Sequence, residues 1–189
     1  MRASTEADRP VLEIRRARVD EIMDVLGVLE DGRRSIARLG IDQWQAGYPD
    51  QAVVEGDLAR GSCCIAFDAA GHPVGTLVLV VGADPDYEPA PVPWLTEAGA
   101  VYASIHRVAT AARVQGHGVM RRLFGYAAAR AAALGCASIR VDTHPGNAPM
   151  RAFLRSRDFQ ELGRFELSTH GEGSRTRIAF ERLLGDASR

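Results

Sequence analysis

The spacing of apolar and polar residues along the chain predicts a domain built from both strands and helices. Apolar runs rich in β-branched residues predict strands, and apolar residues three and four positions apart predict helices. The expected strands are residues 11–15, 63–67, 74–81, 101–110, 138–143, 159–167 and 176–183. The expected helices are one that Asp20 caps and that carries Ile22, Met23, Leu26 and Leu29, followed by residues 33–39, 51–60, 119–134 and 147–157. This order of elements predicts a mixed α/β sheet.

The segments between these elements predict two hairpins and one long loop. Residues 68–73 and 171–174 are short and rich in glycine and polar residues, which favours turns between strands. Residues 82–99 hold four of the nine prolines, so no regular element is expected there. A loop of this length in a compact domain is usually functional or disordered. Because it carries Tyr87 and Trp94, we expect a functional loop.

Composition narrows the classes of function. All 23 basic residues are Arg and none is Lys, which excludes a Walker P-loop and any enzyme that works through a lysine nucleophile or Schiff base. The 23 basic and 24 acidic side chains sum to −1, which argues against a nucleic-acid partner. No Ser-His-Asp or Cys-His order favours a hydrolase, and the histidines lack metal-ligand spacing, so no metal is expected.

Length and apolar runs predict one domain without a membrane span. A chain of 189 residues fits a single domain, which we expect at 11–185 between tails at 1–10 and 186–189. The longest aliphatic run, residues 77–81, is far shorter than the ~18 residues that a membrane span needs. The three cysteines are too few and too irregularly spaced for a disulfide scaffold. We therefore expect a cytoplasmic protein with reduced cysteines and no membrane partner.

Two glycines mark the junction between the strand that ends at Thr110 and the helix that begins at Val119. Gly116 and Gly118 let backbone N–H groups converge on a ligand, and the helix N-terminus adds a partial positive charge. Such a loop can bind an anion. The pattern alone is equally compatible with a plain loop into a helix, because Arg121 stands where a dinucleotide-binding fingerprint needs a third glycine.

This junction resembles motif A of the GNAT superfamily of N-acetyltransferases, whose pattern is Gln/Arg-x-x-Gly-x-Gly/Ala. In that family the backbone amides of the motif hold the coenzyme A pyrophosphate. The segment Arg113-x-x-Gly116-x-Gly118 satisfies the pattern in one register. The segment Gln115-x-x-Gly118-x-Met120 departs from it only at the last position. The resemblance therefore leaves two registers to choose between.

The phase of the following helix selects the second register. The family carries apolar residues three and four positions after the last residue of the motif. The first register would put Arg121 and Arg122 at those positions and bury two arginines. The second register puts Leu123 and Phe124 there, in line with the apolar stripe of the helix. In this register Met120 must point away from the phosphates.

The resemblance extends over about residues 11–185. The segments that look like one branch of the superfamily are 105–109 (IHRVA), 139–147 (IRVDTHPGN), 40–44 (GIDQW) and 48–49 (YP). They imply the GNAT fold, an α/β (α+β) class with a single mixed, mostly antiparallel central sheet, splayed parallel strands and flanking helices. They also imply transfer of an acetyl group from acetyl-CoA to a primary amine of a small molecule or peptide, by direct attack in a ternary complex. The alternative is a non-catalytic acyl-CoA-binding module on the same fold, and a homodimer stays open.

The resemblance also implies the positions of the active-site residues. The family places its base or water-holding residues on the strand before the motif, where His106 is the candidate base and Ser104 shares its face. The backbone N–H of Val108 would stabilise the developing oxyanion. A histidine that only anchors the strand is the other interpretation of His106. The residues expected to bind the cofactor are Val108, Ala109, Thr110, Arg113, Gln115, Gly116, His117, Gly118, Val119, Met120, Arg121 and Asn147.

The acceptor side of the site is less constrained by the sequence. The candidates for its walls are Trp44, Tyr48, Tyr87, Tyr102 and His144, with core packing as the alternative for the aromatic residues. The family's usual general acid is a tyrosine, and Leu154 stands at that position. Tyr102, His144 or water could then protonate the leaving thiolate. Asp142 and His144 share a strand face, which is more typical of a polar contact than of a charge relay.

Overall fold

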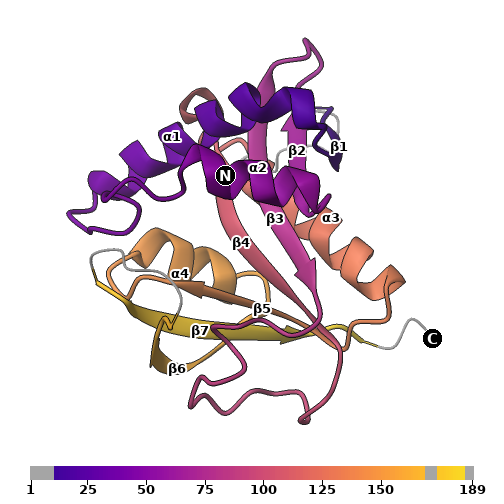
Figure 1. Ribbon diagram of the computed structural model, residues 1–189, viewed down its shortest axis with the longest axis vertical. Helices are drawn as coiled ribbons and strands as arrows, with labels where there is room; N and C mark the ends of the chain where they lie inside the picture. The colour runs from indigo at the N-terminus through magenta and orange to yellow at the C-terminus, as the bar shows by residue number, and fades with distance from the viewer. Residues whose placement is uncertain (1–10, 169–173, 186–189) are drawn as a thin grey trace, which may run out of the picture.

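The computed structural model describes residues 11–168 and 174–185, which form one seven-stranded sheet flanked by helices (Figure 1). The strand order is β1-β2-β3-β4-β5-β7-β6, and every pairing in this part of the chain is antiparallel except that of β4 with β5. The strands are β1 (Glu13–Arg16), β2 (Cys63–Phe67), β3 (Pro73–Val81), β4 (Tyr102–Thr110), β5 (Ser138–Thr143), β6 (Gln160–Glu166) and β7 (Thr176–Leu183). This is the mixed sheet that the sequence predicts.

The helices cover both faces of the sheet, because successive apolar side chains of its strands point to opposite faces. In β2, Cys64 packs into one hydrophobic core and Ile65 into another. The first core contains apolar residues of α3 and α4, and the second contains those of α1 and α2. Period-two alternation therefore fixes which helix lies on which face. The helices are α1 (Ile22–Ala37), α2 (Gln51–Ala59), α3 (Val119–Ala133) and α4 (Ala148–Arg155).

Two predictions about the first helix are wrong. The expected break before residue 33 does not occur, because α1 continues through Gly32 to Ala37. A Cβ atom on Gly32 would lie 2.7 Å from the Cβ of Ala109, so this glycine serves close packing against β4 rather than a helix end. Asp20 does not cap α1, because it lies in a short 3₁₀ turn (Val19–Glu21) that precedes the helix.

The remaining elements agree with the predictions to within one or two residues at their ends. The 68–73 turn joins β2 and β3, with Gly71 at φ 80°. The three cysteines are free and buried, as expected for reduced thiols. Apart from Ser174, the turn predicted at 171–174 lies outside the described residues, as do the tails 1–10 and 186–189. Within 11–168 and 174–185, no helix is long and apolar enough to cross a membrane.

The parallel strands β4 and β5 separate part of the way along their length. Their pairing ends at Ile105 with Val141, after which β4 pairs with β3 and β5 pairs with β7. On the β3 side, Val78 pairs with His106 and Thr76 with Ala109, so β4 carries an extra residue at this point. Such a bulge bends a strand and leaves part of its ladder unpaired. The bulge therefore turns the end of β4 away from β5.

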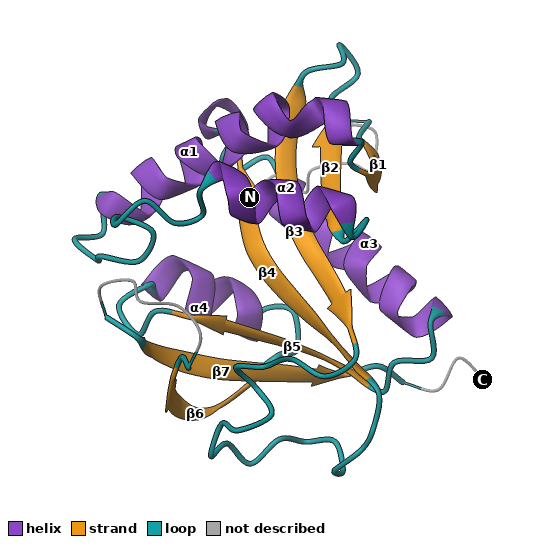
Figure 2. Ribbon diagram, in the orientation of Figure 1, coloured by secondary structure: helices purple, strands orange, loops and turns teal. Residues whose placement is uncertain are grey.

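The long loop at 82–99 is tied to the sheet by one buried carboxylate. Glu181 of β7 is fully buried and accepts hydrogen bonds from the Leu95 backbone N–H and from the Thr96 hydroxyl, the latter at 2.7 Å. Ser138 and Arg140 of β5 donate to the same carboxylate at 2.5 and 3.1 Å. The loop, drawn in teal at the bottom of Figure 2, joins β3 to β4. This carboxylate thus links the loop to two strands.

We expect Glu181→Gln to lower the free energy of unfolding by about 2 kcal/mol at neutral pH, because charged hydrogen bonds in a buried network are lost. Burial alone would raise the pKa of Glu181, but the donors of Ser138, Thr96, Leu95 and Arg140 lower it below its ordinary value. A lowered pKa contributes stability above the unfolded value, and this contribution disappears as the pH falls through the folded value. Urea denaturation should therefore show a gap between variant and wild type that narrows below about pH 4.

Glu97→Gln is the matched control, because Glu97 is an exposed residue of the same loop. It should leave the denaturation midpoint unchanged. An equal loss in both variants, or a gap that widens in acid, would contradict the role given to Glu181.

Candidate active site

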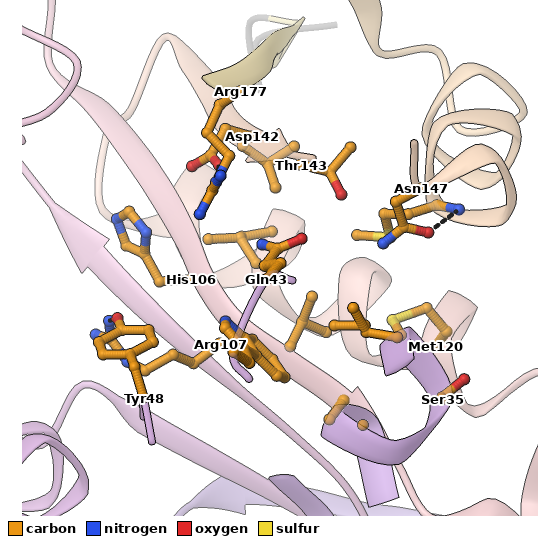
Figure 3. Close-up of a pocket in the computed structure, with 18 of the residues that line it drawn as sticks. Ser35, Gln43, Tyr48, His106, Arg107, Met120, Asp142, Thr143, Asn147 and Arg177 are labelled. Carbon is orange, nitrogen blue, oxygen red and sulfur yellow. Dashed lines mark hydrogen bonds and ion pairs between the residues drawn. The ribbon is translucent and has the colours of Figure 1, made fainter. Parts of the chain in front are cut away.

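A cavity of about 600 Å³ lies where β4 and β5 separate (Figure 3). Its walls come from the end of β4, the end of β5, the helices α1 and α4, and the loops around residues 43–48 and 84–86. The predicted site residues that line it are Trp44, Tyr48, His106, Val108, Ala109, Thr110, Gln115, Met120 and Asn147. The bulge and the end of the parallel pairing thus create the space that these residues share.

One end of the cavity meets the glycine loop before α3. Gly116 and Gly118 adopt positive φ values of 82° and 80°, which favour glycine. Gly118 is the N-cap residue of α3 and no side chain caps the helix, so its first N–H groups have no side-chain acceptor. A Cβ atom on Gly116 would meet open space, so the backbone here is accessible to a ligand. These features fit a phosphate group.

The phase predicted for α3 is confirmed. Leu123 and Phe124 are buried in the core, whereas Arg121 is exposed. Val119 is also buried, so only its backbone can serve a ligand. Arg113 is engaged elsewhere, because its guanidinium lies 3.4 Å from Asp68 and 3.2 Å from the carbonyl oxygen of Pro73. Gly116, His117, Gly118 and Arg121 lie on the surface beside the cavity rather than in its lining.

Asn147 and Leu154 lie on or next to α4, where the sequence predicts them. The Asn147 side chain accepts a hydrogen bond from the Met150 N–H at 3.2 Å, so it caps α4 and lines the cavity at the same time. Leu154 is fully buried in the core. The position of the family's usual tyrosine is therefore occupied by a packing residue.

His106 forms a pair with Asp84, a residue that the sequence analysis missed. The His106 Nε2 atom lies 2.6 Å from Asp84 Oδ2, and both side chains line the cavity. Burial alone would raise the pKa of Asp84, but the hydrogen bond and charge of His106 bring it below its ordinary value. Asp84 is therefore an ionised acceptor, which favours a proton on Nε2 of His106 and leaves Nδ1 as the other ring nitrogen.

Several predicted residues lie behind the cavity rather than in its walls. Ser104 is fully buried on the same strand face as His106, and its hydroxyl has no hydrogen-bond partner among the described residues. The Tyr102 hydroxyl donates to Glu88 at 2.7 Å. Burial raises the pKa of Tyr102 to about 12. Tyr87 is fully buried and stacks on the His106 ring, with 5.6 Å between ring centroids. These three residues therefore pack behind or beside His106 and do not form the wall of the cavity.

The expected pairing of Asp142 with His144 does not form. His144 follows the end of β5, where its Nε2 lies 3.9 Å from Asp42 and its backbone N–H donates to Gln43. Asp142 instead accepts a hydrogen bond from the Tyr87 hydroxyl and lies near a buried arginine of β7, Arg177. The two residues diverge because the strand ends between them.

The bulge in β4 is held by a second group that the sequence analysis missed. Arg107 has a φ of 46°, which is unusual for a residue with a side chain. Its guanidinium donates twice to the buried Asp57 of α2, at 2.7 and 2.9 Å, and once to the Tyr48 hydroxyl at 2.6 Å. Burial alone would lower the pKa of Arg107, but Tyr48 and Asp57 raise it. A buried ion pair therefore fixes the backbone beside His106.

The sequence contains a weak signal for the missed residues. Asp84 and Asp86 stand in the long loop just before the strand of His106, and a carboxylate in such a loop is a candidate partner for a histidine. Asp57 gives no such signal, because its partner Arg107 lies fifty residues away along the chain. Among the described residues, no group of three or more His, Cys, Asp or Glu side chains is placed to bind a metal ion.

Comparison with solved structures supports the fold. An acetyltransferase of the GNAT family from Streptococcus agalactiae has a TM-score of 0.77 at 24% identity, with 91% of this chain and 95% of that chain covered. A GNAT-family acetyltransferase from Listeria monocytogenes has a TM-score of 0.68 at 16% identity, with 92% and 95% covered. The PaiA N-acetyltransferase from Thermoplasma acidophilum, solved in complex with coenzyme A, has a TM-score of 0.65 at 15% identity, with 92% and 99% covered.

A search of curated proteins finds no match to the sequence. The sequence model of the acetyltransferase (GNAT) family matches residues 31–159, a segment that contains the glycine loop, His106 and Asn147. The GNAT resemblance and the fold that it implies are both confirmed. The chain therefore belongs to the acetyltransferase (GNAT) family, whose members use acetyl-CoA as the acyl donor.

Proposed function

We propose that this chain is an acetyl-CoA-dependent N-acetyltransferase that transfers an acetyl group to a primary amine of a small molecule or peptide. The transfer takes place by direct attack in a ternary complex. The observation that carries this proposal is the His106–Asp84 pair, which faces the cavity between the separated strands beside the glycine loop. The family match and the coenzyme A bound to the similar PaiA enzyme support the cofactor.

The residues at the glycine loop suit the cofactor. Acetyl-CoA, when bound, supplies an activated acyl group as a thioester. We assign its phosphates to the N–H groups of Gly116, Gly118, Val119 and Met120 and to the exposed guanidinium of Arg121. The N–H groups of Gln115 and His117 already donate to the carbonyl oxygens of Ala112 and Val114, so these two residues contribute through their side chains. The pantetheine arm is assigned to the backbone of Val108, Ala109 and Thr110 and to the Asn147 side chain, all of which line the cavity. Because Arg113 already contacts Asp68, we assign it a smaller share of the phosphate charge.

His106 has the position and the partner that a general base needs. An alkyl amine of pKa near 10 is only ~10⁻³ neutral at pH 7, so a base must take its proton. Asp84 accepts the Nε2 proton of His106, which leaves Nδ1 to receive the proton of the amine. A buried carboxylate in this arrangement orients the ring and stabilises its charged form, as in hydrolase triads. In the proposal, the Val108 backbone N–H stabilises the developing oxyanion. Ser104 is buried on the same strand face as His106 and lies behind it.

No side chain of this chain is assigned the role of general acid. Leu154 is apolar and buried, and Tyr102, whose hydroxyl donates to Glu88, does not line the cavity. His144 is also absent from the cavity lining. A thiol of pKa near 8.5 leaves readily enough for water to supply the proton. The same missing acid keeps a non-catalytic acyl-CoA-binding module as the second candidate function.

We expect His106→Ala to lower kcat at pH 7 by ~10²–10⁴-fold, because a positioned base typically contributes this much. The affinity for coenzyme A should stay within about twofold, because the phosphates are assigned to the glycine loop and not to the His106 ring. The loss should shrink as the pH approaches the pKa of the amine, since the neutral amine then needs no base. Thiol release across a panel of amines, together with calorimetric titration of coenzyme A, measures both quantities.

His72→Ala is the control, because His72 lies in the exposed turn between β2 and β3. Asp84→Asn should also lower kcat, because the amide neither fixes the Nε2 proton of His106 nor stabilises the charged ring. An unchanged rate in His106→Ala would remove the base assignment. If coenzyme A binds but no amine in a broad panel is acetylated, the non-catalytic candidate is correct.

A second prediction concerns the glycine loop. We expect Gly118→Asp to weaken the affinity for coenzyme A at least about tenfold more than Gly118→Asn does, because only the aspartate repels the phosphates. Both side chains tolerate positive φ and both are favourable helix N-caps, so neither should prevent folding. The two dissociation constants can be compared by calorimetry at low salt. Equal affinities in the two variants would show that the phosphates bind elsewhere.

A further inference from the structure

Asp142 faces the cavity from the strand opposite His106. It follows Val141, the last residue of β5 that pairs with β4, so it stands at the point where the two strands part. Its side chain is 12% exposed and lines the cavity. Figure 3 shows Asp142 and Arg177 on one side of the pocket, close to the imidazole of His106. A group that enters the opening between the strands therefore meets both His106 and Asp142.

One buried tyrosine supports both of these side chains. The Tyr87 hydroxyl donates to Asp142 Oδ1 at 2.7 Å, and the Tyr87 ring stacks on the His106 ring. Burial and the nearby carboxylates of Asp142 and Asp84 raise the pKa of Tyr87 well above its ordinary value, so the phenol remains a donor. Because Tyr87 comes from the 82–99 loop, that loop fixes the distance between the base and the opposite carboxylate.

The charges around Asp142 leave this end of the cavity negative. From the loop it faces Tyr87 and Asp84, from β4 it faces His106, and from β7 it faces Arg177, whose Nε lies 3.3 Å from Oδ2. Arg177 also donates to the carbonyl oxygens of Ser174 and Thr176, so its charge is shared. Asp86 adds another carboxylate to the lining. Arg60 and Arg107 also line the cavity, but both pair with Asp57. The remaining groups are three carboxylates, one guanidinium and one imidazole, an arrangement that favours a cation.

The carboxylate of Asp142 has capacity for a further donor. A carboxylate offers about four acceptor positions. Within the described residues, Tyr87 and Arg177 occupy one position on each oxygen. An ammonium group has three N–H donors, so it could donate one to Asp142 and direct the others into the cavity. A neutral amine or a hydroxyl group would gain much less from this contact, because charge-assisted hydrogen bonds are roughly twice as strong.

We propose that Asp142 binds the ammonium group of the acceptor, and that it thereby selects protonated alkyl amines over neutral arylamines and alcohols. This inference rests on the proposed function, since it concerns the acceptor of the same cavity. The ammonium first binds to Asp142, then gives one proton to His106 Nδ1, and the neutral amine that results is the nucleophile. Burial raises the pKa of Asp142, so the preference for cations should weaken as the pH falls through that raised value. Tyr87 and Arg177 are positioning residues in this scheme.

The test uses binding to the complex with coenzyme A, so it does not depend on turnover. Benzylamine, which is cationic at pH 7, is compared with benzyl alcohol, which has nearly the same shape and no charge. We expect the wild type to bind the amine at least about tenfold more tightly. Asp142→Asn should abolish this preference while the affinity for the alcohol stays within about twofold. Glu97→Gln, on the exposed part of the 82–99 loop, should keep the preference.

A preference that persists in Asp142→Asn, or that is absent from the wild type, overturns this inference. If the wild type acetylates no amine but shows the preference that Asp142→Asn loses, the proposed function fails while the ammonium site stands. Tyr87→Phe supplies a second variant, because it removes the hydrogen bond to Asp142 and keeps the ring. We expect it to raise KM for alkyl amines several-fold with kcat within about twofold. A purely structural role would not raise KM for amines while kcat stays unchanged.

Discussion

The separation of β4 from β5 is the constraint on which the rest of the site depends. A parallel pair that continued to the end of both strands would leave no space between them, and the cavity would not exist. The pairing stops at Ile105 and Val141, where β4 bulges. Arg107 at the bulge has a positive φ and is held by two hydrogen bonds to the buried Asp57. An ion pair on the α2 face of the sheet therefore helps to maintain the opening in which the candidate site residues lie.

The 82–99 loop completes the other half of the site. Its prolines prevent a regular element, and its order comes from contacts with the sheet instead. The buried carboxylate of Glu181 accepts donors from the loop and from β5, and the Arg140 guanidinium lies 4.2 Å from the centre of the Trp94 ring. With its backbone fixed in this way, the loop can present Asp84 to His106 and Tyr87 to Asp142. Burial keeps Tyr87 protonated, and the hydrogen bond with His106 keeps Asp84 ionised. Tyr87 is therefore a hydrogen-bond donor in the site and Asp84 an acceptor.

The absence of lysine limits which side chains can bind phosphate at the glycine loop. A chain without lysine must meet the phosphate charges with backbone N–H groups and arginine. Arg113 is close to the glycine loop in sequence, but its guanidinium contacts Asp68 and Pro73 of the neighbouring hairpin. Arg121 remains exposed at the first turn of α3, beside Gly118. Sequence proximity alone could not separate these two arginines, because a long side chain can reach partners on either side of its own loop.

The sequence by itself determined the elements of the fold, the phase of α3, the glycine loop and the strand of His106. These features depend on local spacing: apolar side chains at helical or strand period, and glycines where φ is positive. Only the tertiary structure decided the partners of the site residues. Asp84 with His106, Asp57 with Arg107 and Tyr87 with Asp142 are separated by 22, 50 and 55 positions. The tertiary structure also decided that Gly32 lies within a helix and that Ser104 and Tyr102 lie behind the cavity. Contacts of this kind arise from the packing of loop and helix against the sheet, and no local pattern encodes the distance between residues that far apart.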